Sequence, residues 1–226
     1  MAIKKRVQDL YAAFDREKAY PLEEALEIVK KSATAKFDET VEVHLRLGID
    51  PKKGDQQIRS TVSLPHGFGE AKKVAVFVPN EKEKEAKEAG ADFVYSEQDI
   101  DKLKKTGKIE FDIAVAVPDI MKSLSPLARI LGPKGLMPSP KNETITTNLK
   151  KTIGELKKGK IAFKNDDSSN VHQAIGKVST DDKALLANYN AFLDALKKTK
   201  PESTKGIFVR AITLCSSMGP GVKVQM

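Results

Sequence analysis

The chain has 226 residues, 40% of them hydrophobic, which is enough for one large domain or two modest ones with a buried core. It contains no run of eighteen apolar residues and no apolar stretch after its basic start, so we expect neither a membrane span nor a secretory signal, and its single cysteine excludes an internal disulfide. A net charge of +8 favours a polyanion such as nucleic acid as partner, whereas 6% aromatic residues and no Trp argue against stacking of many unpaired bases.

The first third of the chain combines two helical patterns with two alternating ones. Apolar residues recur at helical spacing over residues 7–14 and 22–29, and Pro21 suits the first turn of the second helix. Residues 40–49 alternate apolar and polar side chains, which predicts a strand with one solvated face. Residues 58–64 alternate in the same way after a short turn, so we expect the two strands to form an antiparallel hairpin.

The pattern changes after residues 66–69, a glycine-containing junction. Two continuous apolar runs, 73–78 and 111–117, are typical of strands buried on both faces. The elements predicted around them are a helix at 81–89, a strand at 90–95, a helix at 98–105 and a helix start at Pro118. Strands and helices that alternate at this interval indicate βαβ units and a parallel sheet.

Alternation returns in the last third of the chain. Residues 160–164 and 170–178 flank a polar turn, which predicts a second hairpin. Residues 181–198 form an amphipathic helical pattern, and a strand follows at 207–214. That strand leads into a turn of small residues, from Ser216 to Gly221, and a second short strand.

These patterns together predict two domains. An α+β domain with an antiparallel sheet and packed helices is expected from residues 1–67 and 159–226, and an α/β domain with a parallel sheet is inserted at 68–158. Because two closely spaced crossings join the domains, we expect a hinge and relative domain motion. Within the insert, residues 122–158 hold eight basic and two acidic residues, a one-sided distribution that suits nucleic acid but also an ordinary solvated face.

The sequence gives little evidence for catalysis. His44, His66 and His172 lie in different predicted elements without metal-ligand spacing, and Cys215 at a strand end is expected to be a small core residue. Paired aspartates at 166–167 and 181–182 suit a turn and a helix N-terminus. We therefore expect that the protein is not an enzyme and that it binds no metal and no cofactor.

Three segments are candidates for contact with RNA. The turn at 216–219 offers hydroxyls, amides and a thioether that could fit a shaped polar surface, and Gly219 lets the backbone approach a ligand closely. The segment 34–43 carries Phe37, which is either core or an aromatic face flanked by donors. The loop 131–141 is rich in Gly and Pro with exposed apolar residues, and is either a contact loop or a stiff connection.

At these residues the chain resembles the bacterial ribosomal protein L-one family, large-subunit proteins of the mobile side stalk. The blocks that carry the resemblance, in one order along almost the whole chain, are residues 33–43, 47–51, 62–67, 86–92, 118–121, 129–138, 175–179, 191–196 and 217–220. The resemblance implies the same split fold, with the insert Rossmann-like. Ser217 stands where threonine is common in the family, which keeps the hydroxyl.

The resemblance also implies functions and site residues. The implied partners are the stalk region of large-subunit ribosomal RNA, the exit-site transfer RNA and the messenger RNA of the protein's own operon, whose translation the protein would repress. It implies a monomer when free, located in the cytoplasm in the large ribosomal subunit. The residues matched to the RNA contact are Lys36, Phe37, Thr40, Glu42, Ser216, Ser217, Met218 and Gly219, with secondary contacts at His172, Lys134, Met137 and Lys141.

Two other classes of function remain open from the residues alone. A nucleotide-dependent enzyme in the insert would need a phosphate-binding loop, and neither a Walker A motif nor a G-x-G-x-x-G motif occurs. A non-specific basic chaperone or DNA-binding protein would bind through charge alone and would accept duplex DNA as a competitor.

Overall fold

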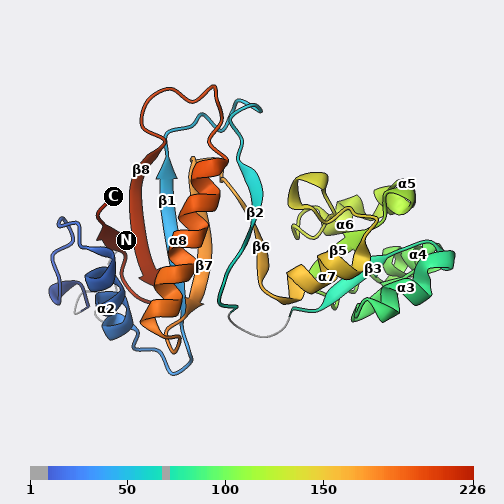
Figure 1. Ribbon diagram of the computed structural model, residues 1–226, viewed down its shortest axis with the longest axis horizontal. Helices are drawn as coiled ribbons and strands as arrows, with labels where there is room; N and C mark the ends of the chain where they lie inside the picture. The colour runs from blue at the N-terminus through green and yellow to red at the C-terminus, as the bar shows by residue number, and fades with distance from the viewer. Residues whose placement is uncertain (1–9, 68–71) are drawn as a thin grey trace. The chain divides into compact units, whose positions relative to one another are not determined.

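The computed structural model describes residues 10–67 and 72–226 (Figure 1). The chain divides into two compact units, Met1–Gly69 with Ala162–Met226 and Glu70–Ile161. The first unit holds an antiparallel sheet, as the alternation of apolar and polar residues along its strands predicts. The second holds a parallel sheet, as the alternation of strands with helices predicts.

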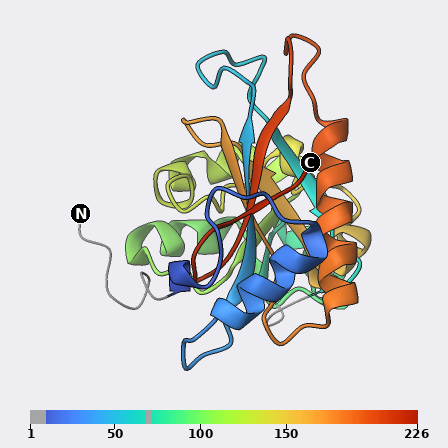
Figure 2. The ribbon, with the colours of Figure 1, turned by 90° about the vertical axis from the view of Figure 1, so that its left-hand side faces the viewer.

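The first unit is built on a four-stranded antiparallel sheet in the order β7-β1-β8-β9. Its strands are β1 (Thr40–Leu47), β7 (Asn170–Lys177), β8 (Val209–Ser216) and β9 (Val222–Val224). Helices α2 (Leu22–Ser32) and α8 (Asp182–Lys198) touch each other and pack on the same side of the sheet (Figure 2). Both helices bury the apolar stripe that their sequences predict.

Strand β1 shows why one face of this sheet is left polar. Val41, Val43, Leu45 and Leu47 are buried, and the residues between them are half-buried or exposed. Successive side chains of a strand point to opposite faces, so the alternation places the valines and leucines against the helices. The other face carries Thr40, Glu42, His44 and Arg46, and we refer to it as the open sheet face.

The first predicted hairpin is wrong, and the second is reduced to a turn closed by a single antiparallel bridge. β2 (Arg59–Ser63) does not pair with β1, because β7 and β8 occupy both edges of β1; it pairs with β6 (Lys160–Lys164) in a separate two-stranded sheet. β6 and β7 therefore belong to different sheets and share an isolated bridge between Asn165 and Val171. Local alternation identified all four strands but held no information about which distant strand completes each ladder.

The predicted N-terminal helix at 7–14 lies partly outside the described residues. Residues 10–12 are helical and residue 13 is in a turn. Pro21 is the N-cap of helix α2, one residue before the first turn in which it was predicted, and the helix extends three residues beyond the predicted 22–29.

The second unit holds a three-stranded parallel sheet in the order β4-β3-β5. Its strands are β3 (Val74–Phe77), β4 (Phe93–Tyr95) and β5 (Ile113–Ala116). Its helices are α3 (Glu83–Glu88), α4 (Glu97–Thr106), α5 (Met121–Leu124), α6 (Ala128–Leu131) and α7 (Leu149–Lys157). All four residues of β3 are buried, which is the reason for its uninterrupted apolar run.

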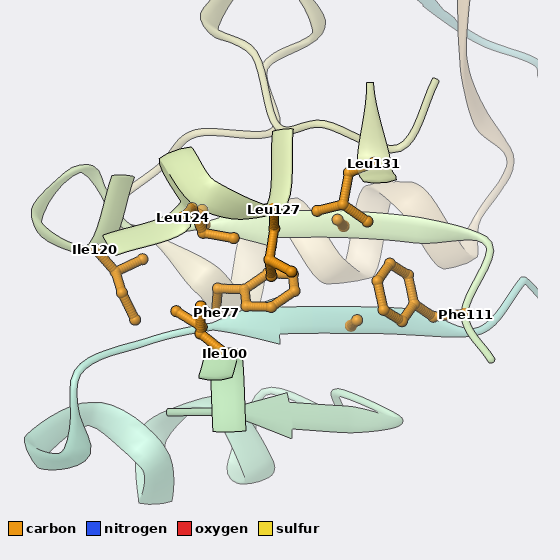
Figure 3. Packing of buried hydrophobic residues seen from close by; sticks show 10 residues of the cluster. Phe77, Ile100, Phe111, Ile120, Leu124, Leu127 and Leu131 are labelled. Atoms are coloured by element: carbon orange, nitrogen blue, oxygen red, sulfur yellow. The ribbon is translucent and has the colours of Figure 1, made fainter. Parts of the chain in front are cut away.

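Apolar layers cover both faces of this parallel sheet. On one face Phe77 and Phe111 pack with Ile100, Leu124 and Leu127 (Figure 3). On the other, Val74, Val76 and Val78 alternate with them and pack against α7. Helix α4 is delimited by its sequence, with a capping box of Ser96 and Asp99 at its start and Gly107 at φ 63° at its end.

The loop at 131–141 differs from the prediction in one respect. Leu136 and Met137 are partly buried against the cluster of Phe77, whereas Lys134 and Lys141 are exposed. The apolar side chains therefore anchor the loop on its own unit and leave its lysines in solvent. None of the helices in the described chain has the length and apolar character needed to cross a bilayer.

Candidate nucleic-acid interface

Strand pairing brings the two candidate segments of the first unit together. β1 and β8 are neighbours, with Val41 opposite Ser216 and Glu42 opposite Cys215. Beyond this ladder the Thr40 amide donates to Ser217 Oγ at 3.0 Å, and the Ser217 amide donates to the Thr40 carbonyl at 3.0 Å. The expectation that the strands bearing these segments are adjacent is confirmed.

A buried carboxylate locks the two segments to each other. Glu39 is 1% exposed; its side chain accepts the Ala35 amide at 2.9 Å and the Met218 amide at 3.0 Å. Its backbone carbonyl accepts the Val178 amide at 2.9 Å. Sequence analysis did not single out Glu39, because a glutamate between Asp38 and Thr40 at the start of a strand has no local sign of burial.

Two large apolar side chains are exposed on the locked segments. Phe37 is 57% exposed and Met218 is 51% exposed. Phe37 is therefore not a core residue, which leaves the other interpretation, an exposed aromatic face. An exposed Phe and an exposed Met on loops held by hydrogen bonds resemble contact residues more than packing residues.

The turn after β8 has little room for other residues. A Cβ on Gly219 would lie 2.3 Å from Ser216 Oγ, closer than real Cβ atoms approach a heavy atom. Ser216 is 1% exposed, and its hydroxyl has no hydrogen-bond partner among the described residues. Ser216 therefore shapes the turn from inside, while Ser217 and Met218 lie at the surface.

Cationic groups border the surface. Lys36 is exposed beside Phe37, as its place in the sequence suggests. Lys177, which the sequence did not single out, donates to Thr40 Oγ1 at 3.1 Å and to the Asp38 carbonyl at 3.4 Å. The Asp38 carboxylate accepts both the hydroxyl and the amide of Ser179, and the hydroxyl's hydrogen bond is the main cause that lowers the Asp38 pKa.

The open sheet face next to this surface carries a cluster of titratable groups. His44 Nδ1 lies 2.7 Å from His172 Nδ1, and His44 Nε2 lies 2.9 Å from Cys215 Sγ. His44 and His172 lie in separate strands, as expected, but the β1–β7 register places them directly opposite each other, a proximity that their spacing in the sequence did not indicate. Burial raises the pKa of Cys215 to about 11, so it is a thiol at neutral pH and a poor nucleophile.

The secondary candidates lie in two places. His172 is exposed on β7, next to the open sheet face just described. Lys134, Met137 and Lys141 belong to the second compact unit, where Met137 is partly buried against the core.

We name the contact surface by its residues: Lys36, Phe37, Thr40, Glu42, Ser217, Met218 and Gly219. Its parts are hydroxyls, amides, apolar side chains and a bordering pair of lysines, which can bind and orient a ligand but supply no general base and nucleophile in contact. Hydroxyls and lysines of this kind serve ribose and phosphate groups.

Comparison with protein families agrees with this chemistry. The model of the ribosomal protein L1p/L10e family matches residues 29–220, which includes β1, the 216–219 turn and the whole parallel sheet. Members of this family are structural proteins of the large ribosomal subunit that bind ribosomal RNA. The chain belongs to the ribosomal protein L1 family.

Proposed function

We propose that the contact surface binds the stalk region of large-subunit ribosomal RNA and reads its folded backbone. The observation that carries this proposal is the pair of locked segments. Residues 177 positions apart, Thr40 and Ser217, are joined by reciprocal hydrogen bonds, with Phe37 and Met218 exposed beside them. A surface that is rigid before binding has little ordering entropy to lose in the complex.

The polar groups suit ribose more than base edges. The Glu42 carboxylate cannot approach a phosphate without repulsion, but it can accept a ribose 2′-hydroxyl, the group that distinguishes RNA from DNA. Ser217 Oγ accepts from the Thr40 amide at 3.0 Å and donates to the Thr40 carbonyl only at 3.4 Å, so its hydroxyl could exchange that long hydrogen bond for one to an RNA acceptor. Phe37 and Met218 would pack on sugars or bases between these polar contacts.

The lysines supply an electrostatic contribution that is independent of sequence. Lys36 is exposed, and Lys177 is held at Thr40 by its hydrogen bond. Each phosphate that such a lysine neutralises releases counterions, so affinity falls as salt rises. Discrimination between RNAs must then come from the hydroxyl and carboxylate contacts, which would remain unpaired against a wrong RNA at about 1–3 kcal/mol each.

Two substitutions test the shape-reading part of the proposal. Thr40→Val removes a hydroxyl that contacts Lys177, and Ser217→Ala removes a hydroxyl that contacts the Thr40 amide. Both should weaken binding to the folded stalk RNA by about tenfold or more, with little effect on a scrambled RNA. Thr147→Val and Ser168→Ala, at exposed hydroxyls that are not part of the contact surface, are the matched controls. An equal loss for both RNAs would reject shape reading.

We further propose two cellular roles, supported by membership of the family and by the same surface. On the ribosome, in the cytoplasm, the protein would assist movement and release of exit-site transfer RNA. Ribosomes depleted of it should then release that transfer RNA more slowly, and an unchanged rate would reject the role. When free, as a monomer, it would bind its own messenger RNA through a mimic of the stalk site; a reporter carrying that messenger's leader should be repressed by wild type but not by Ser217→Ala.

A further inference from the structure

Three side chains with metal-binding atoms converge on the open sheet face. Glu42 and His44 are on β1 and Cys215 is on β8, and one ligand atom from each lies within 4.8 Å of the others. The shortest separation is 2.9 Å, between His44 Nε2 and Cys215 Sγ, and His44 Nε2 lies 3.9 Å from Glu42 Oε2. Cross-strand register produces this meeting, because Glu42 is directly opposite Cys215 and His44 is the next residue on the same face.

We propose that Glu42, His44 and Cys215 form a Zn²⁺ site on the open sheet face, with the fourth position open to solvent. A thiolate, an imidazole and a carboxylate are ligands that zinc accepts together, whereas Ca²⁺ and Mg²⁺ prefer oxygen alone. The site shares Glu42 with the contact surface, but its proposal does not depend on the RNA function.

The geometry needs only small adjustments. Zinc–ligand distances of about 2.0–2.3 Å in a tetrahedron place neighbouring ligand atoms about 3.3–3.5 Å apart. The two separations at His44 Nε2, 2.9 and 3.9 Å, lie on either side of this value. The side chains of His44 and Glu42 are 29% and 37% exposed, so an ion can enter from solvent without opening the core.

The surroundings of His44 orient it as a ligand. A metal-bound histidine usually donates its other ring N–H to an acceptor, which fixes the tautomer. With Nε2 directed to the ion, His44 Nδ1–H donates to His172 Nδ1 at 2.7 Å, and His172 Nε2–H is then directed to Asp166 Oδ2 at 3.5 Å. Asp166 is itself held by the Asn170 and Ser168 amides, so the relay ends on a fixed carboxylate.

Zinc binding requires Cys215 to lose its proton. As the ion binds, the Sγ–H bond breaks, the Sγ–Zn bond forms, and the proton leaves to solvent.

Cobalt titration of the reduced, tag-free full-length protein tests the site without RNA. We expect a thiolate-to-cobalt charge-transfer band that saturates at one Co²⁺ per chain and disappears when Zn²⁺ is added. Cys215→Ser should abolish the band. His172→Gln should keep it but weaken affinity about 10–100-fold, since His172 acts through His44. His66→Gln, at a histidine outside the cluster, is the matched control.

A wild-type protein without the band would overturn the proposal, and so would a band that His44→Gln leaves undiminished. Circular dichroism of each variant separates loss of a ligand from loss of the fold. As a second measurement, Zn²⁺ should raise the melting temperature of wild type and of Glu27→Gln but not of Glu42→Gln. An equal rise in all three would equally reject the site.

Discussion

The Glu39 carboxylate accepts the amide of Met218 at 3.0 Å, across 179 positions of the chain. The same carboxylate accepts the Ala35 amide, so one buried charge fixes the loop before β1 and the turn after β8. A charge-assisted hydrogen bond of this kind is stronger than a neutral one. The contact surface is therefore organised from beneath by a residue that does not itself reach solvent.

Replacement of Glu39 should disturb the contact surface while the sheet still folds. Glu39→Gln removes the charge and turns an NH₂ group toward one of the two amides that need an acceptor. Loss of a hydrogen bond to a charged group costs about 1.5–3 kcal/mol, so affinity for stalk RNA should fall about 10–100-fold. Filter binding measures this loss, with Glu27→Gln on the exposed side of α2 as the control. Wild-type affinity in Glu39→Gln would contradict the role assigned to this carboxylate.

Gly219 offers a test by rescue. Gly219→Ala places a Cβ 2.3 Å from Ser216 Oγ, so either this buried hydroxyl or the turn must shift, and we expect RNA affinity to fall about tenfold. Ser216→Ala removes the clashing atom, and this hydroxyl has no partner to lose among the described residues. The double variant should therefore recover much of the affinity. Gly54→Ala, where a Cβ meets nothing within 4 Å, should bind as wild type. No recovery in the double variant would refute the steric explanation.

Asp38 gives a prediction in pH. Its pKa is lowered mainly by the Ser179 hydroxyl, and Lys177 adds a smaller effect. Carbon-detected NMR should give a titration midpoint below 3.8 in wild type and a higher one in Ser179→Ala. Because the folded-state pKa is lowered, its stabilisation is complete above the unfolded value and is lost as pH falls through the folded one. A midpoint unchanged by Ser179→Ala would show that this hydrogen bond does not form in solution.

Asn188 should be the most costly polar residue to remove from α8. It is fully buried; its side chain accepts the His66 amide at 3.0 Å and donates to the carbonyls of His66 and Ile175. Asn188→Ala leaves these backbone groups without partners, so the free energy of unfolding should fall by about 3 kcal/mol or more. Urea unfolding measures the change against Asn190→Ala, an exposed asparagine on the same helix. Equal stability of the two variants would show that the hydrogen bonds of Asn188 to His66 and Ile175 do not stabilise the fold.

Local patterns were sufficient for the elements and their faces. The alternation of β1 and the apolar stripe of α8 follow from periods of 2 and 3.6 residues, and β3 follows from an unbroken apolar run; all three appear in the structure as expected. Pairing was not predictable in the same way. β2 and β6 are too far apart in the chain for any local pattern to identify them as partners. The assumption of a hairpin failed for β1 and β2, and between β6 and β7 it gave one bridge instead of a ladder.

The residues of the candidate site also differ in whether local sequence could identify them. Phe37, Ser217 and Met218 could be named from the sequence because they lie in distinctive segments at the ends of strands. Glu39, Lys177 and the His44–His172 contact could not, since each owes its role to a partner more than a hundred residues away. Burial of Met137 was missed for a similar reason: an apolar residue in a proline-rich loop has no periodicity to indicate which way it faces.

The central claim is that a preorganised surface reads the shape of a stalk RNA, and one titration tests it most directly. The purified protein is titrated with a folded stalk fragment of large-subunit ribosomal RNA and with a scrambled RNA of equal length, at several salt concentrations. We expect both affinities to fall with salt through counterion release, while the preference for the folded fragment persists at high salt. Equal affinities that decrease together would mean that the basic surface binds by charge alone, and would contradict the assignment of Phe37, Thr40 and the 216–219 turn.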